Sequence, residues 1–419
     1  MSGRRWTQGN DLSLLENGEE FFPAVFADIR AARDCVLIET FIWFDDPIGR
    51  ELQDALLEAR KRGVRVKVAV DGFGTAPISD DMVQELRDAG VELLVYDPRR
   101  QFLGLQPNLF RRLHRKITVI DSAVAYIGGI NYSLEHVREF GALSKQDYAV
   151  RIRGPLVADI EAQCLLDPPR RRRFWQRFVG WLKRRDEPVP TGHPDAQAMF
   201  IWRDNHEYPR AIEAVYRQAI RQAQRHLVIA NAYFFPGYGF LRELRRAAQR
   251  GVRVQLILQG EPDKAYVRTA ASTLYDYLLN AGVEVWEYRE RPLHGKVAVM
   301  DDDWATIGSS NLDPFSLSLN LEANVVVRDA SFKRELGAKL QRLLDQHCVR
   351  LQRDDVPRQR GWRQIIRWLV FHILRKFPQW ARWIPAHSRP LQPSGYQGLV
   401  PSWKTEQQST SASGNTTAE

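Results

Sequence analysis

One sequence pattern occurs twice in this chain and constrains its fold more than any other feature. The first copy begins at His114 and ends at Asn131, and the second begins at His294 and ends at Asn311. Both follow the spacing H-x-K-x4-D-x6-G-[GS]-x-N, and they start 180 residues apart. A period of that size is too long for a solenoid. It predicts a duplicated unit whose functional site lies where the two copies meet.

Helices and strands alternate in both halves of the chain. In the first half a helix that begins near Phe22 is followed by an apolar strand over 35–41, a second helix, and a β-branched strand over 64–70. In the second half a helix over 212–223 precedes a strand over 227–234. Such alternation predicts an α/β layered fold in which much of the sheet is parallel.

The duplication is also visible outside the motif. The segment 59–66 (ARKRGVRV) matches 247–254 (AAQRGVRV), and 89–93 (AGVEL) matches 281–285 (AGVEV). The offsets between matched segments differ slightly, so the copies differ in loop length.

The residue types of the motif suit phosphodiester chemistry. In each copy the histidine and the lysine are two residues apart before a strand-like run, which places both side chains on one face, ~7 Å apart. An ammonium can hold a phosphoryl oxygen, and an imidazole can act as nucleophile or proton donor. The two copies supply His114, Lys116, His294 and Lys296. These groups suffice for a ping-pong exchange of alcohols on phosphorus, with no metal and no other cofactor.

Other polar residues complete the predicted site. Asn131, Ser309 and Asn311 are candidates to hold phosphoryl oxygens. A reactive histidine also needs a partner on its other ring nitrogen to set its tautomer. Candidates lie at similar distances downstream, Asp147 in the first half and Glu322 in the second.

The aspartates of the motif have a different expected role. Asp121 and Asp301 stand at the ends of their strands, so we expect them to brace the adjoining loops more than to touch substrate. One departure from the repeat is Gly129, which occupies the position of Ser309. A hydroxyl contact to phosphate is therefore not expected in the first half.

The doubled pattern resembles the HKD signature of the phospholipase D superfamily. The likeness extends over nearly the whole chain to bacterial cardiolipin synthases of the shorter B type, and the segments 39–44, 229–237 and 308–313 also carry it. It implies two tandem phospholipase D-like α/β/α sandwich domains related by pseudo-two-fold symmetry, with the active site at their seam. The family's catalytic residues map, with none missing, onto His114, Lys116, Asp121, His294, Lys296 and Asp301.

The resemblance also implies an activity. A phosphatidyl group would pass from one phosphatidylglycerol to a second, releasing glycerol and giving cardiolipin, through a phosphohistidine. By analogy with related phospholipases His114 would be the nucleophile and His294 the acid and base, although the sequence leaves open which histidine attacks. The second lipid, phosphatidylglycerol or phosphatidylethanolamine, stays open. The alternatives are a phospholipase D-type hydrolase or an HKD nuclease with the same catalytic set, and a non-catalytic membrane scaffold.

Positive charge is concentrated in two segments. The net charge is +9, yet 168–185 holds eight Arg or Lys and 356–405 holds nine, both without an acidic residue, so the remainder is acidic. A nucleic-acid binder more often spreads its positive charge over its working surface. Seven of the twelve tryptophans lie in these segments, and an apolar helical stripe runs from Trp362 to Phe377. Interfacial tryptophans beside arginines favour contact with an anionic phospholipid membrane.

These patterns divide the chain into five parts. They are a first phospholipase D-like domain (1–166), a basic Trp-containing linker (167–196), a second domain (197–350), a basic amphipathic membrane-contacting helix (351–390) and a disordered tail (391–419). No run approaches the ~20 apolar residues of a membrane span, and the N-terminus is not a signal peptide. We expect a peripheral protein on the cytoplasmic face of the bacterial inner membrane, with no nucleic-acid partner and no obligatory protein partner. The three cysteines are far apart, as expected of incidental thiols.

Overall fold

The computed structural model describes residues 5–75, 78–96, 111–164, 193–260, 274–355 and 392–393. The first half contains β1 (Thr7–Glu16), α1 (Asn17–Ala31), β2 (Cys35–Thr40), α2 (Pro47–Lys61), β3 (Arg65–Asp71), α3 (Asp80–Asp88), β4 (Glu92–Tyr96), β5 (Ile117–Ile120), β6 (Val124–Gly128), the 3-10 helices η1 (Leu134–His136) and η2 (Arg138–Leu143), β7 (Tyr148–Arg153) and α4 (Leu156–Glu161).

The second half repeats this order. It contains β8 (His193–Arg203), α6 (Ala211–Gln222), β9 (His226–Asn231), α7 (Tyr238–Gln249), β10 (Arg253–Gln259), β11 (Glu284–Tyr288), β12 (Lys296–Met300), β13 (Trp304–Gly308), α9 (Pro314–Ser318), β14 (Glu322–Arg328), α10 (Ala330–His347), β15 (Cys348–Arg350) and the 3-10 helix η3 (Arg353–Asp355).

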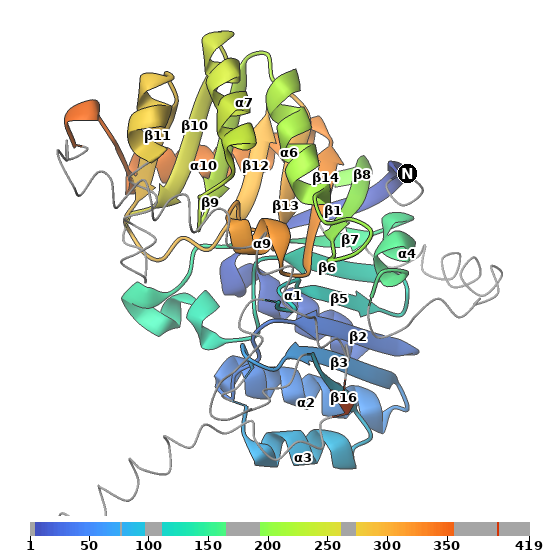
Figure 1. Ribbon diagram of the computed structural model, residues 1–419. Coiled ribbons are helices and arrows are strands. Elements are labelled where there is room, and N and C mark those ends of the chain that lie inside the picture. The colour runs from blue at the N-terminus through green and yellow to red at the C-terminus, as the bar shows by residue number, and fades with distance from the viewer. Residues whose placement is uncertain are drawn as a thin grey trace, which may run out of the picture.

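The strands of both halves form one continuous sheet. Its order is β15-β11-β10-β9-β12-β13-β14-β8-β1-β7-β6-β5-β2-β3-β4-β16, where β16 (Gln392–Pro393) pairs with β4. The antiparallel pair β1–β8 lies at the centre, and corresponding strands follow on either side of it. Figure 1 shows the strands of the second half standing upright above those of the first. The predicted two-fold duplication is therefore present as a symmetric α/β fold built on a shared sheet.

Only part of this sheet is parallel. In each half three strands pair in parallel, β2-β3-β4 and β9-β10-β11, and the neighbouring pairs are antiparallel. The expectation that much of the sheet is parallel was too broad. Tight turns join β5 to β6 and β12 to β13, and such turns can join only antiparallel strands.

The repeated R-G-V segment ends a helix in the same way in both halves. Gly63 and Gly251 have φ of +84° and +90°, the left-handed conformation that glycine adopts without a steric penalty. The next residue, Val64 or Val252, donates its N–H to the carbonyl of Ala59 or Ala247 at 3.1 Å. This local geometry turns the chain from α2 into β3 and from α7 into β10.

Helices cover the sheet over three apolar clusters. One cluster packs α1, α2 and α3 on the first half, and a second packs α6 and α7 on the second half. The third draws buried residues from both halves, with α4 and α10 packed against it. Because this shared cluster fixes the halves against each other, groups from both can hold a defined geometry at the seam.

Several predicted segments lie outside the described residues. These include nearly all of the basic linker 167–196, although β8 already begins at His193, and nearly all of the helix 351–390 and the tail 391–419. Within the described ranges, no helix combines the length and the apolarity needed to cross a bilayer.

Candidate active site

The two motifs meet because each pairs through its backbone with the opposite half. Leu113 forms a parallel bridge with Leu321, and the N–H of His114 donates to the carbonyl of Leu321 at 3.0 Å. In the same way Leu293 forms a bridge with Gln146, whose carbonyl accepts from His294 N–H at 2.8 Å. Each motif histidine is thus placed beside the segment that carries the other half's carboxylate.

The carboxylates bind the histidines across the seam. Nδ1 of His114 is 3.1 Å from Oε2 of Glu322, and Nδ1 of His294 is 2.5 Å from Oδ2 of Asp147. Both carboxylates are fully buried, whereas the histidine side chains are 13% and 16% exposed. Nδ1 of each ring is occupied, so Nε2 is the nitrogen available to a substrate.

The structure brings the four predicted groups together, but not in the pairs that their positions along the chain suggest. Each carboxylate lies downstream of its own histidine in sequence and hydrogen-bonds the histidine of the other half. The bridges at Leu113 and Leu293 are the physical reason, since they align each motif with the opposite half. Neither half alone holds both members of the His114–Glu322 pair or of the His294–Asp147 pair.

The lysines lie beside their histidines, as the two-residue spacing predicts. Nζ of Lys116 donates to the carbonyl of His114 at 2.6 Å, and Nζ of Lys296 donates to the carbonyl of His294. Both side chains are buried. Each ammonium is therefore held next to the reactive imidazole by the backbone of the same motif.

Burial shifts the charges of this cluster toward their neutral forms. It lowers the pKa of Lys116 to about 7, with Glu322 opposing the shift and Lys296 adding to it. It also lowers the pKa of Lys296 to about 8 and raises that of Asp147 to about 6. The pKa of His294 is held well below its usual value by burial and by Lys296. An anionic ligand beside the two lysines would raise the pKa of both and favour their charged forms.

The three candidate phosphate-binding residues differ in their surroundings. The side-chain oxygen Oδ1 of Asn131 accepts the N–H of Ile42 at 3.2 Å, which leaves the side-chain NH2 group for another partner. Within the described residues, Oδ1 of Asn311 is buried without a hydrogen-bond partner, so it can accept a hydroxyl of a ligand, whereas a phosphoryl oxygen would need the NH2 group of this side chain. The hydroxyl of Ser309 instead donates to Oε2 of Glu322 at 2.5 Å. Its geometry favours positioning of Glu322 over contact with phosphate.

Gly129 occupies the corresponding position in the first half for a steric reason. A Cβ atom there would lie 2.3 Å from Oδ1 of Asp147. The glycine therefore makes room for the carboxylate that binds His294, and the two histidine–carboxylate pairs are not equivalent.

Asp121 and Asp301 brace loops at a distance from the histidines. The carboxylate of Asp301 accepts three backbone N–H groups, from Gln224 and Arg225 at 2.9 Å and from His226 at 3.1 Å. Asp121 does the same for residues 33–35 before β2, at 2.7 to 2.9 Å. Each aspartate ties the end of a motif strand to the entry of the neighbouring strand, which favours the structural role expected from sequence.

Replacement of Asp301 by alanine is expected to lower the free energy of unfolding by about 2 kcal/mol, because three N–H groups lose a charged acceptor. Turnover per folded molecule should fall by less than about tenfold. Urea unfolding and an activity assay on the same preparation measure both. Asp302→Ala is the control, since its 75% exposed carboxylate pairs with the exposed Arg225 and should contribute less than about 1 kcal/mol. Unchanged stability with lost turnover would place Asp301 against the substrate instead.

Sequence reasoning missed a third histidine at the site. His136, on η1, is fully buried, its Nε2 accepts the N–H of Asn131 at 3.2 Å, and its Nδ1 lies 3.8 Å from Oδ2 of Asp147. Its ring packs edge-on against that of His294, with centroids 5.5 Å apart. Since Nε2 is an acceptor, the proton of the neutral ring lies on Nδ1 and faces Asp147. A signal was present, because this histidine follows only five residues after the motif.

His136, Asp147 and His294 also form the group of described residues best placed to hold a metal ion, with potential ligand atoms within 4.8 Å of one another. Two of those atoms already share the short hydrogen bond between His294 and Asp147. A metal would have to replace the contact that sets the tautomer of a reactive histidine. The donor set is therefore better suited to proton transfer than to metal binding.

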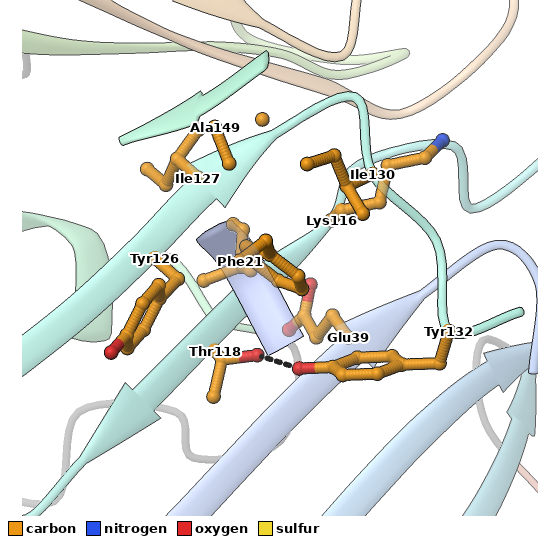
Figure 2. A pocket seen from close by; sticks show the side chains of 11 residues that line it. Phe21, Glu39, Lys116, Thr118, Tyr126, Ile127, Ile130, Tyr132 and Ala149 are labelled. Carbon is orange, nitrogen blue, oxygen red and sulfur yellow. Dashed lines mark hydrogen bonds between the residues drawn. The ribbon is translucent and has the colours of Figure 1, made fainter. Parts of the chain in front are cut away.

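A small pocket lies behind the first motif strand and is separate from this site. Figure 2 shows it between Phe21, Tyr126 and Tyr132, with the hydroxyls of Thr118 and Tyr132 joined at 2.8 Å. The nitrogen of Lys116 points away from the pocket. The pocket thus lies within the packing around β5 and β6 and leaves the lysine free for the seam.

Comparisons with known proteins find relatives of this chain. A family model described as "Cardiolipin synthase, PLD-like domain" matches residues 25–159 and 216–344. The chain is 50% identical over 387 residues to cardiolipin synthase B of Salmonella typhimurium, covering 91% of this chain and 92% of that protein. It is 35% identical over 330 residues to cardiolipin synthase A of Pseudomonas putida, covering 77% of this chain and 66% of that protein.

Among solved structures, the fold is similar to that of a phosphatidylserine synthase from Haemophilus influenzae, with a TM-score of 0.64 at 17% identity over 89% of this chain and 95% of that one. A symmetric sheet with paired HKD motifs at its seam defines a phospholipase D-like protein. The chain belongs to the family of cardiolipin synthases with phospholipase D-like domains.

Proposed function

We propose that this protein is a cardiolipin synthase, a phosphatidyltransferase that makes cardiolipin and glycerol from two molecules of phosphatidylglycerol. The observation that carries the proposal is the pair of complete histidine–carboxylate contacts at one seam, each beside a buried lysine. Such a pair suits a reaction in which one imidazole bonds to phosphorus while the other handles a proton. The identity to cardiolipin synthases of the B type supports the lipid substrate.

The reaction has two balanced steps. Nε2 of His114 attacks phosphorus, the bond from phosphorus to the glycerol headgroup breaks, and His294 gives its proton to the departing oxygen. A hydroxyl of the second phosphatidylglycerol then attacks the phosphohistidine, the P–N bond breaks, and His294 takes the hydroxyl proton. Lys116 and Lys296, with the amides of Asn131 and Asn311, hold the phosphoryl oxygens as charge moves.

The two carboxylates fix the tautomer and the orientation of the imidazoles that they bind. Glu322 holds the Nδ1 proton of His114, so that the lone pair of Nε2 faces phosphorus. Asp147 does the same for His294 and stabilises its imidazolium form when it carries the transferred proton. Burial lowers the pKa of His294 and so favours its neutral form. The anionic phosphodiester of a bound substrate favours the protonated form that the first step requires.

Membrane contact is the second part of the proposal. The basic segments within 167–196 and 351–390 bring cations and tryptophans to an anionic bilayer, where each cation contributes ~1 kcal/mol. The protein would then work as a peripheral enzyme on the cytoplasmic face of the bacterial inner membrane. An anionic surface also concentrates phosphatidylglycerol, which is itself anionic.

Full-length protein incubated with phosphatidylglycerol vesicles is expected to release glycerol and cardiolipin in equal amounts, because each transfer joins two lipids and frees one headgroup. Thin-layer chromatography of the lipids and an enzymatic glycerol assay measure the two products. Addition of a chelator should leave the rate unchanged, since no step needs a metal ion.

Three outcomes would contradict this proposal in different ways. Phosphatidic acid as the sole lipid product indicates a hydrolase, and cleavage of DNA without lipid turnover indicates a nuclease. Wild-type product yields from a His114→Ala, His294→Ala double variant would remove the histidines from the chemistry. Vesicles that also contain phosphatidylethanolamine reveal whether that lipid competes as acceptor.

A further inference from the structure

Close to the site, the two halves differ in the length of the connection that follows the motif. Asn131 precedes Asp147 by sixteen residues, whereas Asn311 precedes Glu322 by eleven. The longer connection contains η1 and η2, and the shorter one contains the single helix α9. The extra length therefore lies on the side of Asp147, the carboxylate that binds His294.

Lys145 lies where this longer connection returns to the site. Its N–H donates to the carbonyl of Glu135 at 2.7 Å, and the N–H of Gln146 donates to Pro292 of the second half at 2.9 Å. Two residues further on comes Asp147. Gln146, which lies between them, accepts the N–H of His294 at 2.8 Å. This backbone contact places Lys145 beside the Asp147–His294 pair.

This lysine differs from the two motif lysines in exposure and partner. Its ammonium pairs with Glu135, and the two side chains are 19% and 27% exposed, whereas Lys116 and Lys296 are 5% and 0% exposed. After burial and Lys296, Lys145 is the next largest influence that lowers the pKa of His294. It is a solvent-accessible cation within electrostatic reach of the reactive imidazole.

Resting on the proposed function, we propose that Lys145 binds the phosphate of the second phosphatidylglycerol and so selects an anionic lipid as acceptor over water or a neutral alcohol. The attacking hydroxyl of that lipid is separated from its phosphate by three carbons, a span on the order of 6 Å at ordinary bond lengths. Lys145 stands two residues before Asp147, so a phosphate on its ammonium would keep the attacking hydroxyl close to the Asp147–His294 pair. The acceptor phosphate would take the place of the Glu135 carboxylate on the ammonium.

The surroundings of Lys145 fit an amphipathic acceptor. Phe140 and Leu143, on the same connection, are 40% and 67% exposed. A cation flanked by exposed apolar side chains offers contacts both to a phosphate and to the apolar part of a lipid. Water and ethanol carry no phosphate, so neither can form the ion pair with Lys145.

Competition between two acceptors tests the subsite. Phosphatidylglycerol vesicles in buffer containing ethanol offer the phosphohistidine both an anionic lipid and a neutral alcohol. In either case the hydroxyl attacks phosphorus, the P–N bond breaks and His294 takes the proton, giving cardiolipin or phosphatidylethanol. In Lys145→Gln the ratio of cardiolipin to phosphatidylethanol should fall about tenfold, the low end for a lost contact to a charged group. The total rate of phosphatidylglycerol consumption should change by a smaller factor than this product ratio.

Two further variants make the result specific. Lys145→Arg keeps the charge and should restore most of the product ratio. Lys67→Gln is the matched control, because Lys67 on β3 is similarly exposed at 18% and pairs with Glu92 at 2.9 Å. An unchanged ratio in Lys145→Gln overturns the subsite, and so does an equal loss of both products. A wild-type protein that forms phosphatidylethanol but no cardiolipin refutes the proposed function itself.

Discussion

Alanine at His114 is expected to abolish cardiolipin formation, with a loss of about 10⁴- to 10⁶-fold, because no other group can form the covalent bond to phosphorus. Alanine at His294 is expected to cost about 10²- to 10⁴-fold, the usual contribution of a positioned acid and base. The covalent intermediate distinguishes the variants. Brief incubation with phosphatidylglycerol, digestion and mass spectrometry should find phosphatidyl-His114 in wild type and His294→Ala, and none in His114→Ala.

The location of the label decides the roles of the two histidines. A label on His294 that survives His114→Ala would exchange them, and loss of the label from both single variants would mean that the acid is needed before the bond can form. His206→Ala, a change at an exposed histidine, is the control and should leave both label and turnover as in wild type.

The second large effect concerns the carboxylates that cross the seam. Glu322→Gln and Asp147→Asn are each expected to lower turnover by about 10²- to 10⁴-fold, because an amide favours the wrong tautomer of its histidine. Glu322 binds His114, so its variant should slow formation of the phosphohistidine. Asp147 binds His294, which acts as acid in formation and as base in breakdown, so its variant should slow both steps and still accumulate some labelled intermediate.

Rapid-quench measurement of the phosphohistidine separates the two steps. The measurement shows which carboxylate variant prevents labelling of the histidine. It should be the variant of the carboxylate that binds the labelled histidine across the seam. If the carboxylate from the same half blocks it instead, the crossed arrangement is wrong. Glu243→Gln is the control, since Glu243 is a buried carboxylate on α7 that pairs with arginines away from the seam.

Much of the fold could be predicted because its signals are local. The apolar run 35–41 corresponds to β2 (Cys35–Thr40), and the helix expected over 212–223 corresponds to α6 (Ala211–Gln222). The repeated R-G-V segments mark helix ends because glycine at that point adopts a left-handed conformation. Such features depend on neighbours a few residues away.

Elements that depend on distant partners were harder to predict. β1 was not recognised, although it joins the two halves through β8. Its apolar alternation is confined to a few residues around Leu12 and Leu14, and irregular pairing with β8 near Gly9 interrupts it. The role of a central strand comes from the two strands that pair with it, and neither is close in sequence.

The sequence by itself determined the chemistry of the site. Two histidines and two lysines, at a spacing that is repeated 180 residues further along the chain, predict phosphodiester exchange. The acidic residues downstream of each motif are the candidate carboxylates. Residue type and short spacing carry this information, since acid–base and nucleophilic character belong to the side chains themselves.

Only the tertiary structure decided which groups act together. Glu322 binds His114 and Asp147 binds His294 because backbone bridges align each motif with the opposite half. The longer connection also brings Lys145 close enough to Asp147 and His294 for its charge to lower the pKa of both. The order of residues along the chain does not show that alignment, because it is set by packing between residues that are far apart in sequence.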